Sequence, residues 1–472
     1  MKRTLALLLA VLTAFSLCAC GQAAAPAAAP AEEAAPAVEA APAEEAAPAE
    51  EAAPAEEISY AGEKLTIWTC LTADAQFDVL NKQFTELCEE LGVEAEVDRL
   101  SFSEMIQKIA TADATGEYPD IMHVNFGGTA QLYADEVLIT VDDLIDEIGA
   151  DDFSDAYKRV LTGADGHIYG LPDWAMHTSV WYRKDLFEEK GLEIPTTWAE
   201  FKDTAVALND GDAMKGFPVP LDGVQVAAQT LYELMCSKGV YFLDPTSGEY
   251  VFDQEKDEVV EIIDYLVDLY KAASPAASLT WSWGDYRNAL AVTGTVGMTL
   301  DMGAVIGNAQ GNAPEMTEKL GCFDFPGVDG SKVASFGSGY CFVGTKSDDP
   351  ARQQLIKDFL VALYTPERAA ERALSRPMFA FPSYLPAFEI YKASEKVADF
   401  QTEVDTIMDA FENSTWYWYG MENGLSPMSA AIEATTIFGE ALQGACDGTY
   451  TSEEAFDLIN EDLLASYEAY AG

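Results

Sequence analysis

The residues of this sequence that could bind a metal ion or form a redox pair are its cysteines. Six of them are scattered along the main part of the chain: Cys70, Cys88, Cys236, Cys322, Cys341 and Cys446. No two form a Cys-x-x-Cys pair and none has zinc-site spacing, so the sequence indicates neither a metal centre nor a redox motif. Three disulfides could form in an oxidising compartment. Because a large hydrophobic body does not need them, we expect mostly free, buried thiols.

Motifs of nucleophilic and phosphoryl chemistry are absent from the sequence. It contains no serine-hydrolase elbow, no P-loop and no Gly-x-Gly-x-x-Gly fingerprint. Asp210-Gly211-Asp212 could begin a calcium loop, but the other ligands do not follow, which favours a plain turn. A glycoside hydrolase, which needs only two suitably spaced carboxylates, stays open as an alternative because the chain has 80 acidic residues.

Two further cysteines, Cys18 and Cys20, end an apolar run near the N-terminus. A basic start at residues 2–3 and an apolar run over 5–17, too short to cross a bilayer, are typical of a secretory signal. Leu17-Cys18-Ala19-Cys20-Gly21 resembles a bacterial lipobox, with a small residue before the cysteine that takes the lipid. We therefore expect residues 1–19 to be a signal peptide and Cys20 to be lipidated. An ordinary signal with incidental cysteines is the alternative.

The segment after Cys20 has the composition of a spacer. Residues 23–57 are Ala, Pro and Glu with one Val, and proline recurs every six residues from Pro30 to Pro54. Such a segment can neither continue a helix nor bury a core, so we predict a semi-extended tether over 20–57. The whole chain carries a formal charge of −53. This charge argues against nucleic acid and anionic membrane surfaces as partners, because both need clustered Lys and Arg.

From about residue 58 the sequence alternates strand and helix patterns. Residues 64–69 read as a strand, and apolar residues then recur at helical spacing from Phe77 to Leu91, before Gly92. A strand over 93–100, a capping box over 101–104 with its helix, and a strand over 121–124 follow. This order predicts a mostly parallel sheet whose ligands bind beyond the carboxyl ends of the strands. Asn125 directly follows the third strand and is therefore a candidate site residue.

The second half of the chain repeats this pattern. Thr197 and Glu200 form a capping-box pattern before an apolar helix. The other elements we expect there are a strand over 180–182 and helices over 185–190, 259–270, 350–363 and 452–471.

Four short stretches, in this order, resemble the extracellular solute-binding family of ABC importers, of the maltose-binding type. They are Tyr118-Pro119-Asp120-Ile121, Gly166 to Pro172 before Tyr182 to Phe187, Pro195-Thr196-Thr197-Trp198, and Gly297-Met298-Thr299. The resemblance implies an α/β fold with two periplasmic-binding-protein-like lobes, each a mostly parallel sheet covered by helices, joined by a hinge of crossing segments. It implies an N-terminal lobe of 58–172 plus 341–376 and a C-terminal lobe of 173–340 plus 377–472. After Met298 the sequence departs from the maltose-binding pattern.

The resemblance also implies a ligand cleft between the lobes. Its residues would be Thr72, Asp74, Asn125, Asp173, Trp174, His177, Trp281, Trp283, Asp301, Tyr340, Arg376 and Phe379. Aromatic faces stack on the CH faces of a sugar ring while amides and carboxylates bind its hydroxyls, so this set suits a carbohydrate. Trp281 and Trp283 could equally be core residues, His177 a structural histidine, and Trp416 to Tyr419 rim or core.

The function implied is capture of a carbohydrate-like solute by hinge closure and delivery to membrane permease subunits of an ABC transporter, without catalysis, metal or cofactor. We expect a monomer, lipid-anchored at the extracellular face of the cell membrane through Cys20. A non-sugar solute such as a peptide is a further alternative.

Overall fold

The computed structural model describes residues 60–223, 225–331, 334–413 and 415–471. The predicted signal peptide, Cys20 and the tether over 20–57 lie outside these residues. Residues Ile58–Gly472 form one compact unit. Within the described part of the chain, no helix is both long enough and apolar enough to cross a membrane.

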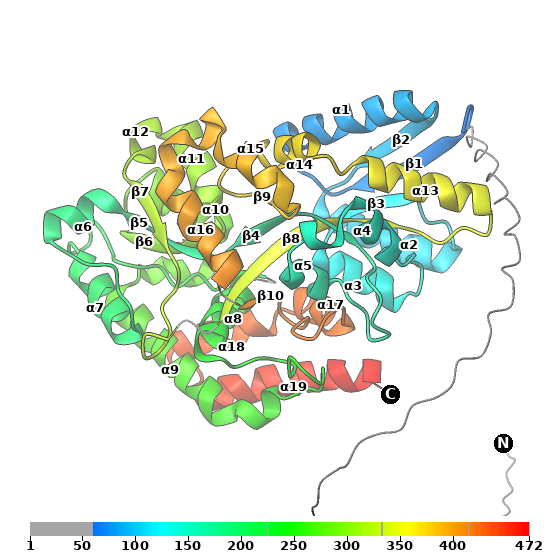
Figure 1. Ribbon diagram of the computed structural model, residues 1–472. Coiled ribbons are helices and arrows are strands. Elements are labelled where there is room, and N and C mark those ends of the chain that lie inside the picture. The colour runs from blue at the N-terminus through cyan, green and yellow to red at the C-terminus, as the bar shows by residue number, and fades with distance from the viewer. Residues whose placement is uncertain (1–59, 224, 332–333, 414, 472) are drawn as a thin grey trace, which may run out of the picture. The chain divides into compact units, whose positions relative to one another are not determined.

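Among the described residues, ten strands build the sheets of this unit (Figure 1). They are β1 Lys64–Thr69, β2 Glu94–Arg99, β3 Ile121–Asn125, β4 Leu171–His177, β5 Ser179–Arg183, β6 Met298–Asp301, β7 Leu320–Phe323, β8 Ala334–Gly344, β9 Phe381–Pro382 and β10 Thr415–Tyr417.

Helices surround both sheets (Figure 1). They are α1 Asp74–Leu91, α2 Phe102–Thr115, α3 Phe126–Ala134, α4 Asp142–Ile148, α5 Asp155–Val160, α6 Lys184–Lys190, α7 Trp198–Leu208, α8 Val226–Lys238, α9 Lys256–Ala273, α10 Trp283–Ala291, α11 Ala304–Asn312, α12 Pro314–Thr317, α13 Pro350–Ala362, α14 Pro366–Ala373, α15 Phe388–Lys392, α16 Gln401–Asn413, α17 Pro427–Ala434, α18 Ile437–Asp447 and α19 Ser452–Ala471.

Local sequence signals fix several element ends as predicted. Helix α1 ends at Gly92, whose φ of 72° is in the left-handed region that glycine adopts without strain. Helix α2 begins with the complete Ser101 and Glu104 capping box. At α7, Thr197 caps the Glu200 amide, but the Glu200 carboxylate accepts from Thr196 instead of closing the box on Thr197.

The larger sheet mixes strand directions. Its order is β2-β1-β3-β8-β4-β9, with β10 paired to β8. Strands β1, β2 and β3 are parallel, as predicted, whereas β8 runs antiparallel to both β3 and β4. Every residue of β3 and β4 is buried, because other strands and helices cover both faces of this sheet.

The smaller sheet differs from the expected parallel arrangement. Its order is β6-β5-β7, and β5 is antiparallel to both neighbours. Periodicity locates strands without giving their direction. The chain returns from β5 to β6 through a long helical segment, α6 to α10, which is long enough for either direction. The prediction of a mostly parallel sheet is therefore wrong for this half of the molecule.

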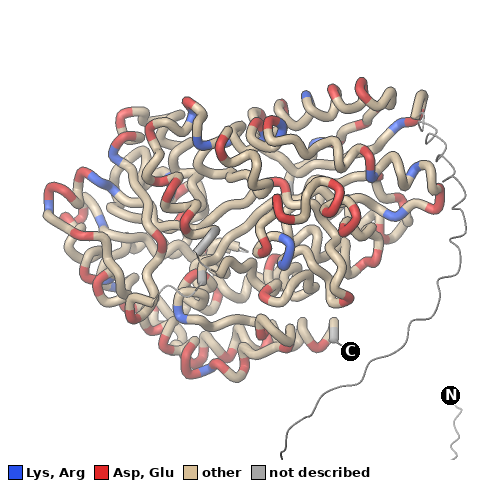
Figure 2. The backbone as a smooth tube through the Cα atoms, in the orientation of Figure 1, with Lys and Arg blue, Asp and Glu red and all other residues tan. Residues whose placement is uncertain are grey.

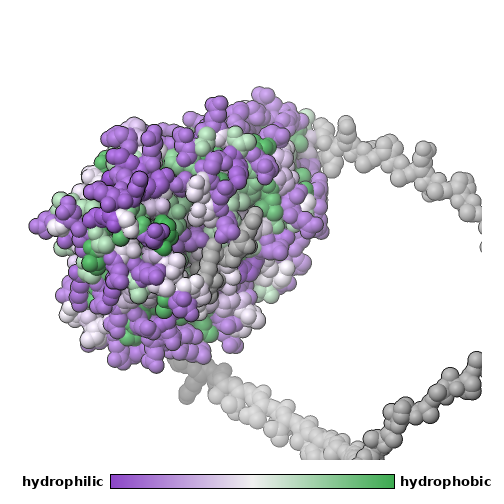
Figure 3. All heavy atoms as spheres, turned by 60° about the vertical axis from the view of Figure 1, so that its left-hand side comes forward, coloured by the Kyte–Doolittle hydropathy of each residue, from purple (hydrophilic) through white to green (hydrophobic). Residues whose placement is uncertain are grey.

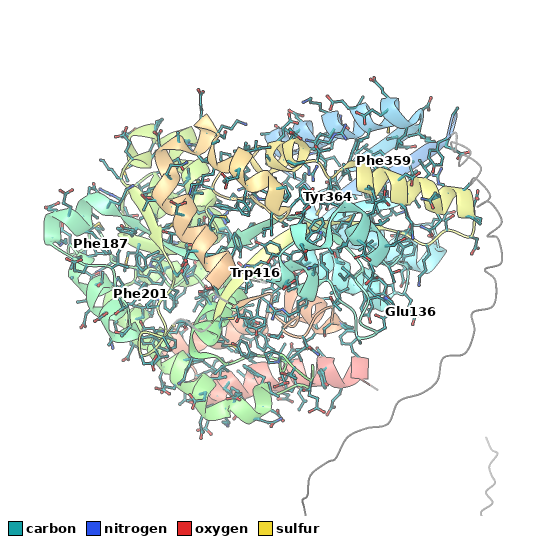
Figure 4. The ribbon with its side chains drawn as sticks, viewed as in Figure 1. Glu136, Phe187, Phe201, Phe359, Tyr364 and Trp416 are labelled. Carbon is teal, nitrogen blue, oxygen red and sulfur yellow. The ribbon has the colours of Figure 1, made fainter. Side chains whose placement is uncertain are left out.

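The elements form two groups, one around each sheet (Figure 1). Helices α1, α2 and α13 lie beside β1 to β3, and helices α6, α7, α11 and α12 lie beside β5 to β7. Figure 4 shows the aromatic core of each group, with Phe359 and Tyr364 in the first and Phe187 and Phe201 in the second. Helix α17 packs on α3 and also contacts α19, so the C-terminal segment contacts more than one part of the unit.

Strand β8 depends on close contact between glycine and aromatic rings. A Cβ atom on Gly337 would lie 1.5 Å from Nε1 of Trp416, and one on Gly339 would lie 2.5 Å from the Phe126 ring. Trp416 is fully buried beside β8, and its Nε1 donates to the Met176 carbonyl at 3.2 Å (Figure 4). The Trp416 ring, which the sequence left as rim or core, therefore lies in the core.

The cysteines in the described part of the chain are free and buried, as predicted. Among the same residues, no group of three or more His, Cys, Asp or Glu side chains could hold a metal ion.

Candidate functional site

A cavity of about 280 Å³ lies where residues from both groups of elements meet. Residues at or just beyond the ends of β1, β3, β4 and β6 contribute, together with the middle of β8. The remaining walls come from α8, α10, the segment after α14, Pro220 before α8 and Trp418 after β10. The lining residues are Cys70, Thr72, Asn125, Met176, Thr178, Pro220, Gln225, Val226, Gln229, Thr230, Trp283, Tyr286, Arg287, Leu300, Asp301, Met302, Phe336, Ser338, Tyr340, Arg376, Phe379 and Trp418. The volume is near the lower end of the range for small-molecule sites, roughly 300–1,000 Å³, which favours a small solute.

The structure brings seven of the twelve predicted ligand residues to this cavity. These are Thr72, Asn125, Trp283, Asp301, Tyr340, Arg376 and Phe379. Asn125 ends β3, as expected for a polar residue beyond a strand end, and its Oδ1 accepts from the Gly128 amide at 3.0 Å. This capping bond uses one acceptor and leaves the amide donors of Asn125 for a ligand.

The other five predicted residues do not line the cavity. Asp74 is exposed at the start of α1, where it pairs with Arg99 at 2.8 Å. Trp281 is partly buried outside the lining, against the hydrophobic core. Neither position has the concave surroundings of a binding site.

Asp173 belongs to a buried ion-pair network. One carboxylate oxygen accepts from Nε of Arg372 at 2.6 Å, and the other lies 2.9 Å from Nε2 of His123. Burial alone would raise the pKa of Asp173, but the Arg372 charge and the His123 hydrogen bond together lower it below its ordinary value. The Asp173 carboxylate is therefore fully engaged beneath the cavity.

Trp174 and His177, on the same strand, are also buried in the core. The Trp174 side chain is 3% exposed and packs against the rings of Tyr340 and Phe379, so it supports two lining residues from behind. His177 is buried, and its Nε2 lies 2.9 Å from Asp324. These residues do not line the cavity because every residue of β4 is buried, and residues distant in the sequence, such as Tyr340 and Phe379, pack against Trp174.

The polar side of the cavity is organised by Asp301. Its carboxylate pairs with Nε of Arg287, and its Oδ1 accepts from the Val305 amide at 2.9 Å, which caps the start of α11. Trp181 Nε1 donates to the backbone carbonyl of Asp301 at 3.1 Å. These contacts hold Asp301 and Arg287 in one defined geometry at the cavity wall.

Arg376 has a different environment. Its guanidinium lies 3.6 Å from the centroid of the Phe379 ring, a cation–π contact. Burial, and then repulsion from Arg287, lower the pKa of Arg376 to about 10. Across the described residues, no carboxylate is within ion-pair distance of this guanidinium.

The backbone beside Arg376 is tightly constrained. Met378 is fully buried with a φ of 66°, and its amide donates to the Tyr391 hydroxyl at 3.0 Å. A Cβ on Gly303, in the loop after β6, would lie 1.7 Å from the Met378 carbonyl oxygen. Glycine is therefore required at 303 both by this contact and by its φ of 90°.

Several lining residues were not among the twelve predicted ligand residues. Trp418 stacks on Phe336 at 5.3 Å between ring centroids, and its Nε1 donates to Ser429 at 2.7 Å. Gln229 accepts from Nε1 of Trp283 at 3.3 Å. The aromatic run 416–419 was a visible signal for Trp418, whereas Gln229 and Arg287 follow ordinary helical patterns.

Comparison with known proteins places the chain in a family. Residues 71–370 match the profile of the family described as bacterial extracellular solute-binding protein. An ABC transporter periplasmic-binding protein of Escherichia coli is 26% identical over 36% of this chain and 40% of its own length. An amino-acid ABC transporter periplasmic-binding protein of Sinorhizobium fredii is 24% identical over 51% of this chain and 56% of its own length. The chain thus spans about half the length of these two relatives.

Other similarities cover more of the chain. An arabinooligosaccharide-binding protein of Halalkalibacterium halodurans is 21% identical over 65% of this chain and 68% of its own length. The crystal structure of an ABC transporter solute-binding protein of Agrobacterium radiobacter in complex with ribitol superposes with a TM-score of 0.69 at 19% identity, covering 87% of this chain and 99% of that one. This similarity confirms the two-lobed α/β fold.

Proposed function

This chain belongs to the bacterial extracellular solute-binding protein family, and we propose that its solute is a carbohydrate, delivered to the permease of an ABC importer. The observation that carries the proposal is the chemistry of the cavity wall. Aromatic rings of Trp283, Tyr340 and Phe379 line it together with the amides of Asn125 and Gln229. Rings that stack on CH faces, beside groups that bind hydroxyls, suit a sugar or polyol.

Two relatives support this solute class through their own ligands. One similar protein binds arabinooligosaccharides, and the similar crystal structure holds ribitol. The relative from an amino-acid ABC transporter supports the second candidate, a solute that is not a sugar. The cavity volume favours one or two sugar rings over a long oligosaccharide.

Binding without hydrolysis fits the distribution of carboxylates. Asp301 is the one carboxylate among the described residues that line the cavity, and it pairs with Arg287. Glycoside hydrolases use two carboxyl groups on either side of the scissile bond. A glycosidase is therefore the weaker proposal.

The mechanism we propose is closure of two lobes over the solute. We assign residues 58–172 plus 341–376 to one lobe and 173–340 plus 377–472 to the other. Lining residues such as Asn125 and Asp301 then belong to different lobes, so a solute that contacts both favours the closed form.

The N-terminal segment supplies the proposed anchor. Lipidation at Cys20, followed by the tether over 20–57, would keep a monomeric binding body at the extracellular face of the cell membrane. The acidic composition of the chain suits a body held away from anionic headgroups.

A thermal-shift screen of the full chain against monosaccharides, disaccharides, polyols and amino acids tests the proposal. A solute at 100 times its dissociation constant stabilises the folded state by about 2.7 kcal/mol. We expect a sugar or polyol to give this shift and to be recovered chemically unchanged. Stabilisation by an amino acid alone would support the second candidate, and turnover of the bound sugar would support a hydrolase.

A further inference from the structure

The cavity is more basic than the chain around it. The chain carries a formal charge of −53, and acidic residues are spread over the backbone of the unit (Figure 2). The surface seen in Figure 3 is correspondingly dominated by hydrophilic residues. Two arginines, Arg287 and Arg376, nevertheless line the cavity, where Asp301 is the one carboxylate in the part of the chain that the structure describes.

Asp301 is already satisfied by other groups. It pairs with Arg287 and caps the amide of Val305, so its two oxygens both have partners. The Asp301 charge raises the pKa of Arg376, but burial and the Arg287 charge outweigh it and lower this pKa. Arg376 thus contributes a second positive charge for which the protein provides no close counter-ion.

Two carboxyl groups near the cavity do not supply the missing charge. Glu233 lies outside the lining, accepts from the Phe336 amide at 3.2 Å, and burial raises its pKa well above the ordinary value. Glu433 lies 3.4 Å from the Tyr419 hydroxyl, and burial raises its pKa to about 8. Burial therefore favours the neutral form of both carboxyl groups.

The start of α8 adds to the positive potential. Gln225 and Val226 line the cavity at the N-terminus of this helix of 13 residues, and the Gln225 side chain makes no capping hydrogen bond. The N-terminal end of a helix carries a partial positive charge, which favours a nearby anion.

We propose that the solute is an acidic sugar whose anionic oxygen group pairs with the Arg376 guanidinium, an inference that rests on the proposed carbohydrate function. A partly buried cation without a counter-ion is unfavourable, and a ligand anion removes that cost on binding. The planar guanidinium donates two parallel hydrogen bonds to a carboxylate or phosphate. Phe379 holds the guanidinium plane in place from one side. The wall of Trp283 and Tyr340 remains for the sugar ring.

Calorimetric titration of the full chain with matched pairs of solutes tests this inference. Each pair consists of an acidic sugar and its neutral parent. The pairs are glucuronate and glucose, and galacturonate and galactose. Glucose 1-phosphate and galactose 1-phosphate distinguish a phosphate from a carboxylate. Glutamate and citrate are acids without a sugar ring. We expect an acidic sugar to bind at least about tenfold more tightly than its neutral parent, the usual size of a charge-assisted hydrogen bond.

Variants of Arg376 assign the effect to this side chain. Arg376→Gln should weaken binding of the acid more than binding of the neutral parent and so remove the preference for the acid, and Arg376→Lys should keep part of it. Lys190→Gln, an exposed residue at the end of α6, makes the same charge change outside the cavity and should keep the full preference. The melting temperature of each ligand-free variant shows that it is folded.

The outcomes separate the two proposals. A neutral sugar that binds as tightly as its acid, or an acid whose affinity survives Arg376→Gln, overturns the acidic-sugar inference and leaves the carbohydrate function standing. Binding of glutamate or citrate with no sugar overturns the carbohydrate function instead. Absence of binding across all solutes of the panel contradicts both.

Discussion

The indole ring of Trp174 is stacked on the phenol ring of Tyr340, with centroids 4.4 Å apart and planes inclined by 22°. Tyr340 lines the cavity, and Trp174 lies behind it in the core. The orientation of a ring that lines the cavity is therefore set by a second ring in the core. Tyr340 is therefore a candidate for contact with the solute, whereas Trp174 holds the Tyr340 ring in position.

Trp174→Ala is expected to lower the free energy of unfolding by about 3–5 kcal/mol, because it leaves a cavity in a packed core. Trp283→Ala is the matched control, since Trp283 lines the cavity and is only partly buried. It should weaken solute binding by about 1–3 kcal/mol with little change in melting temperature. Melting temperature and affinity, measured on both variants, decide between the roles. If Trp174→Ala lost affinity alone, the ring would contact the solute.

Gly337→Ala is expected to destabilise the protein by about 1–3 kcal/mol, the usual effect of overpacking a core. The added methyl group would overlap Nε1 of Trp416, which is itself bonded to the Met176 carbonyl. Gly307→Ala, in α11, has open space around its Cβ and should be neutral or stabilising by about 0.5–1 kcal/mol. Chemical denaturation of both variants measures the difference. Equal stabilities would contradict the close packing of β8 on Trp416.

Stability should fall between about pH 4.5 and 7 through the buried Glu422. This carboxyl group accepts from the Tyr232 hydroxyl at 2.6 Å, and burial raises its pKa from 4.5 to about 7. Because the folded state holds the proton more tightly than the unfolded state, the stabilisation is complete below the unfolded pKa and is lost as pH rises through the folded pKa.

Glu422→Gln keeps the hydrogen-bond acceptor and removes the titration. The variant should gain stability relative to the parent as pH rises to about 7, by up to about 3 kcal/mol, and the difference should then level off. Glu461→Gln, on an exposed position of α19, is the control. Denaturation curves across this pH range are the measurement, and a difference that does not vary with pH would exclude Glu422 as the titrating group.

Cys20→Ser tests the proposed anchor, because serine cannot carry the thioether-linked lipid. Fractionation of cells that express the variant should show the chain in the soluble extracellular fraction or as an uncleaved precursor. A processed variant that stays with the membrane would mean that another feature holds the protein there.

Sequence patterns predicted the parts of the fold that depend on neighbouring residues. The strand at 64–69 and the final helix at 452–471 agree with the structure at both ends. Alternation of polar and apolar residues, capping side chains and glycine stops act over a few positions, which is why these elements could be predicted. The direction of β6 and β7 depends on how a long helical segment folds back, and no local pattern encodes it.

Part of the cavity lining could be predicted from the ends of strands. Asn125 lines the cavity because it ends a strand of the parallel part of the sheet. Asp173 and Trp174 also lie on a strand, β4, but Arg372 and Tyr340, distant in the sequence, enclose them. Arg287 was not predicted because it lines the cavity through its ion pair with Asp301. That pair joins helix α10 to strand β6, and no local sequence pattern indicates it.

The contact between Gly303 and the Met378 carbonyl limits how this binding site could evolve. Asp301 lies two residues before Gly303 and Arg376 two residues before Met378, so one backbone contact sets the spacing of both charged side chains. Any larger residue at 303 would push the two segments apart. Descendants of this protein that acquire a new solute are therefore expected to exchange the side chains at 301 and 376 and to inherit the glycine unchanged.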